Sequence, residues 1–247
     1  FRLCNLHPDL FVTLTTTTVM MSVKACLVSL LACLVMHTLV ECQDLPTSIL
    51  DLQTLFNGDW DNKDQVRKGL TYCELYQIRL VPLDILALRP AATFFAEGAW
   101  NGTVIVLVVG VVSQNVDGSI AMTRYNFTDI TKYKPGQFDP KDLANITYAD
   151  LFGDTSCTAG FEFSGRNIIT FDWPDCRHTY DERHPEYSEM ITCDHYTFSV
   201  SIGMGEANTH FPVYFKRNGP RFPIVRAPAS YVSPCDDTSS GSINYQL

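Results

Sequence analysis

The chain has 247 residues, enough for one or two domains or for one large β-rich domain. Hydrophobic residues make up 46% and charged residues 18%, so there is apolar material for a core, and this excludes a disordered chain. The 18 Lys and Arg residues against 27 Asp and Glu leave a net charge of -9, which disfavours nucleic-acid binding because a phosphate backbone is repelled.

Residues 1–42 are predicted to be a leader followed by a secretory signal peptide. Lys24 gives a short positive region after Met20, and Ala25–Val40 is an apolar stretch of the length that signal peptides have. A membrane anchor is the alternative, but a spanning helix needs roughly 20 apolar residues. We expect cleavage after Cys42. The product is a secreted, extracellular protein with one domain over 43–226, a Ser- and Pro-rich tail over 227–247 and no membrane segment.

Cleavage there leaves five cysteines, which should pair in an oxidising compartment. Two disulfides and one remaining thiol are expected, and this thiol is either free or bridges two chains. No Cys-x-x-Cys spacing occurs among the five, which disfavours a zinc or thioredoxin-like site. The disulfide candidates are Cys73, Cys157, Cys176, Cys193 and Cys235.

Three Asn-x-Thr sequons agree with secretion and predict a glycoprotein; they are Asn101, Asn126 and Asn145. A glycan on Asn126 would point to water. Strand alternation then puts Met122 and Arg124 on the outside with it and turns Tyr125 and Phe127 toward the interior.

Two short helices are expected at the start of the domain. Ser48 followed by Asp51 resembles a capping box on an amphipathic helix that Gly58 would end. Asp61 can cap a second helix over Asn62–Gly69. The pattern after that point is typical of β-strands.

The expected strands are separated by turn signals about every 8 to 12 residues, which indicates a β-sandwich or a barrel. Tyr76, Ile78 and Leu80 share one face of the first strand, which Pro82 is expected to end. The strands are predicted at Leu75–Val81, Ala92–Trp100, Val104–Val112, Ile120–Phe127, Phe161–Ser164, Ile168–Asp172, Tyr187–Val200 (or two strands with a bend), Val213–Lys216 and Phe222–Arg226.

Glu97 is the strongest candidate for a functional carboxylate. In its strand it shares a face with Thr93, Phe95 and Ala99. A carboxylate among aromatic rings can bind the pyrrole N–H groups of a tetrapyrrole or act as an acid or base with a raised pKa. The alternative is a residue on the outside of a barrel, in water.

Other catalytic or metal signatures are weak. His178 and His184 could bind a metal, but their spacing fits no standard site, and a solvated polar loop explains them. No Gly-x-Ser-x-Gly elbow and no Gly-rich phosphate loop occurs, which disfavours a hydrolase and a nucleotide-binding protein. We expect no metal site.

Five motifs follow one another in the order of a known family. They are Leu55–Gln65, Phe94–Trp100, Tyr125–Phe127, the Cys157…Phe161–Gly165…Cys176 block, and Ser188–Met190 with Gly219–Phe222. Through their order and spacing, the chain from about Leu50 to Arg226 resembles the CpcT/CpeT-type chromophore lyases.

The resemblance implies a mainly β fold, an antiparallel β-barrel shaped as a calyx, often as a homodimer. The family holds a linear tetrapyrrole, or bilin, and attaches it through a thioether to a Cys of an acceptor protein; it requires no further cofactor. On this basis we expect Glu97 as the pyrrole partner, Arg221 as a propionate partner, and a cavity wall that includes Tyr76, Tyr125 and Trp100.

Three functions stay open. The family's Pro-Tyr-Arg-Gln element corresponds to Asn101–Val106 here, which has no Arg. The protein is either a bilin lyase, a secreted non-catalytic carrier of a bilin or another small apolar ligand, or an extracellular structural protein with a filled cup. A retained cavity would separate the first two from the third, and covalent transfer to an acceptor Cys would separate the first from the second.

Overall fold

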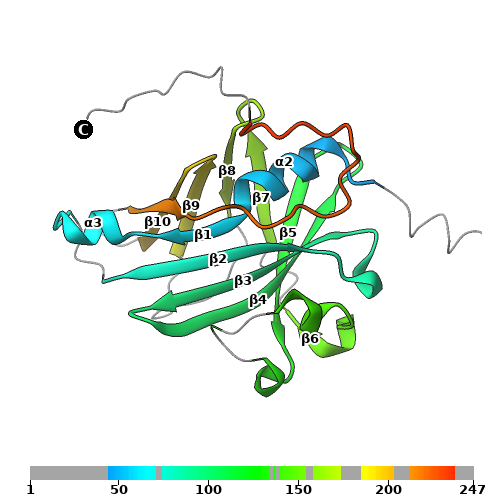
Figure 1. The fold of residues 1–247 in the computed structure, drawn as a ribbon, viewed down its shortest axis with the longest axis horizontal. Helices are drawn as coiled ribbons and strands as arrows, with labels where there is room; N and C mark the ends of the chain where they lie inside the picture. The colour runs from blue at the N-terminus through cyan, green and yellow to red at the C-terminus, as the bar shows by residue number, and fades with distance from the viewer. Residues whose placement is uncertain are drawn as a thin grey trace, which may run out of the picture. The chain divides into compact units, whose positions relative to one another are not determined.

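The structure is a computed structural model that describes residues 44–70, 74–133, 136, 139–153, 158–173, 185–202 and 212–236. Two helices, α2 (Thr47–Phe56) and α3 (Lys63–Arg67), flank a short first strand, and strands dominate the rest (Figure 1). The strands are β1 (Gly58–Asp61), β2 (Tyr76–Leu83), β3 (Ala92–Trp100), β4 (Thr103–Gln114), β5 (Ile120–Phe127), β6 (Leu151–Phe152), β7 (Thr158–Phe163), β8 (Ile168–Asp172), β9 (Pro185–Thr192), β10 (His195–Ile202) and β11 (Val213–Asn218).

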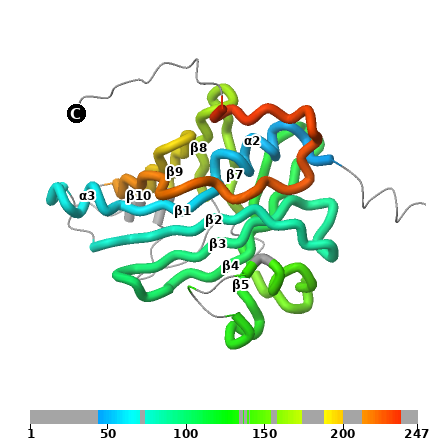
Figure 2. The backbone as a smooth tube through the Cα atoms, in the orientation of Figure 1, coloured from blue at the N-terminus to red at the C-terminus, as the bar shows by residue number. Residues whose placement is uncertain are grey.

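The described strands form a closed antiparallel barrel, as expected. Their order is β4-β3-β2-β1-β11-β10-β9-β8-β7-β5-β6, and a further pairing of β4 with β5 closes ten of them into a ring. The two-residue β6 adds to the end of β5. Closure satisfies the backbone groups that an open sheet would leave at its edges. The chain path around the barrel can be followed in Figure 2, where β1 lies between β2 and the late strands.

Apolar side chains form two separate clusters, one inside the barrel and one outside. The inner cluster includes Trp60, Phe94 and Phe215 and also takes in the buried side chains of α2. The outer cluster includes Phe95 of β3 and Val109 of β4, which lie on the faces of these strands that point away from the interior. Strands that are apolar on both faces need cover on both sides. Four short 3₁₀ helices, η1 (Leu86–Leu88), η2 (Ile130–Lys132), η3 (Pro140–Leu143) and η4 (Tyr148–Asp150), occur in the described loops, and Leu88, Leu143, Ile146 and Leu151 complete the outer cluster.

The faces predicted for β5 are wrong. Met122 is buried in the inner cluster and Arg124 borders the interior, whereas Phe127 and Tyr125 belong to the outer cluster. Cross-strand pairs confirm this, since Arg124 lies opposite Gly110 and Tyr125 opposite Val109. The exposure of Asn126 does not make its face the outer one, because the residue lies near the end of its strand.

Several element boundaries also differ from the expectation. Helix α2 begins at Thr47, so Ser48 lies inside it and does not cap it. Strand β2 continues through Pro82 to Leu83. For Tyr187–Val200 the two-strand alternative is confirmed, as β9 and β10. Strand β1 was not expected at all, because four residues with two aspartates give no apolar pattern.

The link between α2 and β1 is held by the segment predicted as the last strand. Asn57 Nδ2 donates to the carbonyl of Phe222 at 2.6 Å, and the Phe222 N–H donates to Asn57 Oδ1 at 2.9 Å. The Val225 N–H likewise donates to a side chain, Gln53 Oε1, so Phe222 and Val225 do not pair with a strand. Gly58 follows with φ +130°, and a Cβ there would lie 2.3 Å from Arg217 Nη1. Only glycine fits this position.

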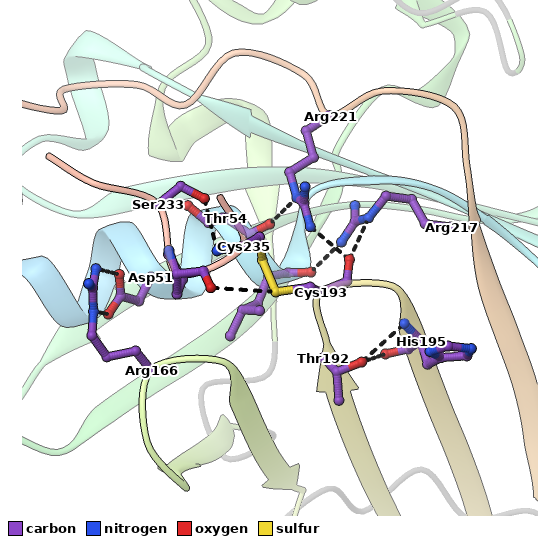
Figure 3. Close-up of a disulfide and its surroundings, with 12 residues drawn as sticks. Asp51, Thr54, Arg166, Thr192, Cys193, His195, Arg217, Arg221, Ser233 and Cys235 are labelled. Carbon is purple, nitrogen blue, oxygen red and sulfur yellow. Dashed lines mark hydrogen bonds and ion pairs between the residues drawn. A yellow bond between two sulfur atoms is a disulfide. The ribbon is translucent and has the colours of Figure 1, made fainter. Parts of the chain in front are cut away.

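Two arginines hold the C-terminal end of α2. Arg217 Nη2 donates to the Leu55 carbonyl at 3.1 Å, and Arg221 Nε donates to the Thr54 carbonyl at 3.0 Å (Figure 3). Both guanidinium groups also donate to the Cys193 carbonyl, at 2.8 and 2.7 Å. Positive charge at the carbonyl end of a helix is favourable because the last carbonyls have no partner within the helix.

A disulfide between Cys193 and Cys235 fixes the described end of the chain (Figure 3). The segment before Cys235 runs across α2 (Figure 1), where the Tyr231 hydroxyl donates to Asp51 and lies 2.8 Å from the Thr54 hydroxyl. Asp51 also receives two hydrogen bonds from Arg166, at 2.9 and 2.7 Å. The other three disulfide candidates, Cys73, Cys157 and Cys176, lie outside the described residues.

Removing this disulfide should destabilise the domain. The bridge spans 42 residues, so the loss of loop-closure entropy in the unfolded state corresponds to about 4 kcal/mol. Replacing both Cys193 and Cys235 with Ala should therefore lower the free energy of unfolding by about 3 to 4 kcal/mol in urea titrations. The reduced wild type is the control and should lose a similar amount. Equal stability of oxidised wild type and double variant would contradict the bridge.

Candidate functional site

The barrel interior contains a cavity of about 170 Å³ beside the inner cluster. Its wall is mainly apolar and aromatic, and its polar groups are few. The lining side chains come from α2 and from strands on all sides of the barrel: Phe56, Tyr76, Ile78, Leu80, Ala96, Glu97, Gly98, Val106, Val108, Met122, Arg124, Phe171, Trp173, Glu189, Tyr196 and Phe198. An apolar pocket with a few convergent polar groups is the usual form of a small-molecule site.

Glu189 of β9 is the buried carboxylate of this cavity. Its Oε1 accepts a hydrogen bond from Trp173 Nε1 at 2.9 Å, and its Oε2 accepts one from the Tyr196 hydroxyl. Trp173 directly follows β8 and Tyr196 lies on β10, so the two neighbours of β9 each supply a donor. Two donors fix the orientation of the carboxylate and leave lone pairs on both oxygens for a third partner.

The charge of Glu189 is controlled mainly by its burial. Desolvation raises the pKa of the Glu189 carboxyl to about 7, against the opposing effects of the two hydrogen bonds and of Arg124. Burial also raises the pKa of Tyr196 and of Tyr76, and the nearby Glu189 carboxylate adds to both shifts. Near neutral pH the site therefore contains a carboxyl group that is close to its titration midpoint and two tyrosines that stay protonated.

Arg124 and Tyr76 complete the polar part of the wall. The Arg124 guanidinium lies over the Trp173 ring, 4.6 Å from its centroid, a cation–π distance. Tyr76 lies beside Gly98, where an added Cβ would come within 2.9 Å of the Tyr76 hydroxyl oxygen. Because Gly98 has no side chain, the Tyr76 hydroxyl has room beside it at the cavity.

Of the two predicted aromatic residues Tyr76 and Trp100, only Tyr76 lies at the interior. Tyr76 lines the cavity, with its ring 5.5 Å from that of Phe215. Trp100 lies at the end of β3 and is 37% exposed; its ring is 5.7 Å from Tyr76, and its Nε1 donates to Glu74 Oε2 at 2.7 Å. Trp100 is therefore beside the cavity, not part of its wall.

Glu97 does not have the position expected of it. It borders the cavity, but it shares the outer face of β3 with Phe95, and its Oε2 accepts a hydrogen bond from the Gly136 N–H at 2.7 Å. It also lines an outer groove together with Arg79, its partner across the β2–β3 pair. Glu97 therefore lies at the border between the cavity and the outer groove, and its role as the pyrrole partner stays a prediction.

Tyr125 and Arg221 also lie away from the cavity. Tyr125 packs on the outer cluster, with its ring 5.9 Å from that of Tyr148, because the faces of β5 are the reverse of the expectation. Arg221 is engaged with the carbonyls of Thr54 and Cys193 at the end of α2. These hydrogen bonds at the end of the helix account for the position of the Arg221 guanidinium without a ligand.

Four cavity residues were not predicted: Glu189, Trp173, Tyr196 and Arg124. The sequence does contain a signal that Glu189 faces the interior. It lies two residues before the buried Ile191 in the same strand, so both side chains are on one face. Tyr196 has the same relation to Phe198. For Glu97 the signal was ambiguous, because Phe94 and Phe95 make both faces of β3 apolar.

The remaining predicted sites are placed as follows. Asn101, Asn126 and Asn145 are all exposed, with Asn101 in the turn between β3 and β4. His178 and His184 lie outside the described residues. Among the described residues, no three His, Cys, Asp or Glu side chains gather as a metal site would require, and no described helix has the length and apolar character needed to span a membrane.

Comparison with known proteins gives little support for a function. No family model matches the chain, and no curated protein matches it. Among solved structures, it is similar to a chain described as "SeMet CRL Protein of Arabidopsis", with a TM-score of 0.48 and 10% sequence identity over 70% of this chain and 97% of that chain. So distant a similarity carries no argument, and membership of the CpcT/CpeT-type family stays a prediction.

Burial of Glu189 should make stability depend on pH. Because its pKa is near 7 in the folded protein and near 4.3 when unfolded, the folded state binds more protons between these values. The free energy of unfolding should therefore fall as pH rises from about 4.5 to 7, by about 3 kcal/mol, and then level off.

Glu189→Gln removes this titration and keeps the shape of the side chain. Subtracting its unfolding free energy from that of the wild type at each pH cancels the contribution of all other groups. The wild type should lose about 3 kcal/mol relative to the variant between pH 4.5 and pH 8. A difference that stays constant over this range would show that Glu189 titrates normally.

Proposed function

We propose that the protein binds a small, largely apolar ligand inside its barrel, with Glu189 as the polar anchor. The observation that carries this proposal is the interior cavity of about 170 Å³, lined by aromatic and aliphatic side chains around the buried carboxylate of Glu189, with Glu97 at its border. A purely structural barrel has no need of this arrangement. Burying a carboxyl group without a full set of partners costs stability, and such a cost is usually connected with a functional site.

The size of the cavity favours a carrier of small ligands. An apolar cavity of about 150 Å³ accommodates benzene, whereas sites for drug-sized molecules measure about 300 to 1,000 Å³. A ligand of one or two rings therefore fits without rearrangement. The disulfide supports the further proposal that the protein is secreted, because such bonds persist in oxidising compartments.

A bilin is the second candidate ligand, and one observation favours it. Glu189 lies among aromatic rings and retains lone pairs, which is the chemistry proposed above for pyrrole N–H groups. A linear tetrapyrrole is larger than the present cavity, so its binding would require side chains to move out of the interior. Lyase activity would further require an acceptor thiol to reach the ligand.

Binding of toluene tests the proposed function. We expect measurable heats on titration of the full chain, produced through a secretory pathway. Ala96→Leu, which fills part of the cavity, should weaken the affinity about tenfold or more. The matched control is Ala99→Leu, three residues along the same strand on its outer face, which should bind as the wild type does. Absence of toluene binding to the folded wild type would refute an accessible cavity.

The visible spectrum of a linear tetrapyrrole such as biliverdin distinguishes the second candidate. On the small-ligand proposal, adding the protein should leave the spectrum unchanged. A red-shifted, sharper band that disappears on denaturation would establish a non-covalent bilin carrier. Colour that survives denaturation would establish covalent chemistry and a lyase-like activity.

A further inference from the structure

The polar groups of the cavity restrict the ligand more closely than its size does. Both oxygens of Glu189 already accept one hydrogen bond each, from Trp173 and Tyr196, and when the carboxyl is ionised they can only accept more. A ligand that meets this carboxylate through an acceptor atom would leave two acceptors facing each other. The ligand must therefore present a hydrogen-bond donor to Glu189.

The charges around the cavity exclude a strongly charged ligand. Arg124 lies near the carboxylate and over the Trp173 ring, so a cationic ligand would meet a like charge. An anionic ligand would meet Glu189 itself. A neutral donor avoids both repulsions and leaves the interaction between Arg124 and Glu189 in place.

The aromatic wall favours a ring. Phe56, Phe171 and Phe198 line the cavity together with Tyr76 and Tyr196. Rings pack against such walls edge-to-face or offset, with a gain beyond the area they bury. Trp173 already makes the kind of contact that a ring N–H can make here, because its indole N–H donates to Glu189 Oε1 at 2.9 Å.

Tyr76 provides a second polar contact. Its hydroxyl makes no hydrogen bond to any residue in the described part of the chain, although the ring is packed between Trp100 and Phe215. A hydroxyl can donate or accept, so it tolerates a substituent of either kind on the ligand. The obligatory recognition is therefore at Glu189, and Tyr76 adjusts to the rest of the molecule.

We propose that the barrel selects a neutral heteroaromatic molecule of one or two rings whose ring N–H donates to Glu189. The inference rests on the proposed function, because it names the class of ligand that the same cavity takes. The donor is required only while Glu189 is ionised. The other titratable or charged groups that line the cavity with Glu189 are Tyr76 of β2, Glu97 of β3, Arg124 of β5 and Tyr196 of β10. Burial raises the pKa of both tyrosines, so both stay protonated between pH 5.5 and 8.5.

Indole and benzofuran form a matched pair of probes. They have the same size and shape, but benzofuran has an oxygen in place of the N–H. Calorimetric titration of the full chain at pH 8.5 should show indole binding about 10- to 100-fold more tightly than benzofuran. This is the difference in affinity expected for one hydrogen bond to a charged acceptor. At pH 5.5, where Glu189 is protonated, the preference should fall below about threefold.

A variant assigns the preference to Glu189. In Glu189→Gln the preference at pH 8.5 should fall to the wild-type level at pH 5.5. Glu162→Gln changes an exposed carboxylate on β7, which is separated from β9 by β8; it is the control and should keep the full preference. The fold of each variant is checked by near-ultraviolet circular dichroism, because Trp173 lies at the site.

The outcomes separate this inference from the proposed function. Equal binding of indole and benzofuran by the wild type would leave the cavity as a binding site and overturn the requirement for a donor. No binding of either probe would overturn both. An indole preference that persists in Glu189→Gln would place the donor contact at another residue and overturn the role given to Glu189.

Discussion

Closure of the barrel depends on a four-residue strand. β1 pairs with β2 on one side and with β11 on the other, so it joins the first and last parts of the sheet. A strand this short is weakly specified by its own sequence, and its position is set by what precedes it. Helix α2 leads into β1 through Asn57 and Gly58, and Arg217 and Arg221 hold the end of that helix. The capped helix therefore fixes the register of the strand that closes the ring.

The interior shows how a stable barrel can retain a site. Most of the inner volume is filled by α2 and by large rings such as Trp60 and Phe94, which supply the apolar burial that folding requires. The remaining space surrounds Glu189, whose burial opposes stability at neutral pH. The well-packed end of the barrel offsets the cost at the polar end, as is common when a binding site is built into a core.

Much of the fold could be predicted from the sequence, because alternation and turn residues are local signals. The bounds of β3, β5 and β8 agree with their predicted ranges, and Tyr76, Ile78 and Leu80 share the inner face as expected. β1 could not be predicted, since its pairing partners are distant in the chain. The predicted strand at Phe222–Arg226 is wrong because Asn57 takes both backbone groups of Phe222, a contact between residues 165 positions apart.

The candidate site was harder to predict for a related reason. On β3 both faces are buried, the outer one by Leu143 and Ile146, so burial does not show which face is the inner one. This led to Glu97 as the carboxylate of the cavity, whereas the carboxylate that Trp173 and Tyr196 hold inside it is Glu189 and Glu97 lies at its border. On β5 an exposed asparagine near the strand end suggested the wrong face for Tyr125 and Arg124. The pattern of apolar residues within one strand was insufficient to tell the inner face from the outer one. In both strands the outer face is buried by loop residues that pack over the barrel.

The position of α2 has a consequence for biosynthesis. The helix is at the beginning of the domain, but the groups that hold it come from the end: Arg217, Arg221, Tyr231 and the Cys193–Cys235 bridge. Until residues 217–235 have been synthesised, α2 has none of these partners. The helix therefore reaches its final packing only when a segment 162 or more positions later in the chain becomes available.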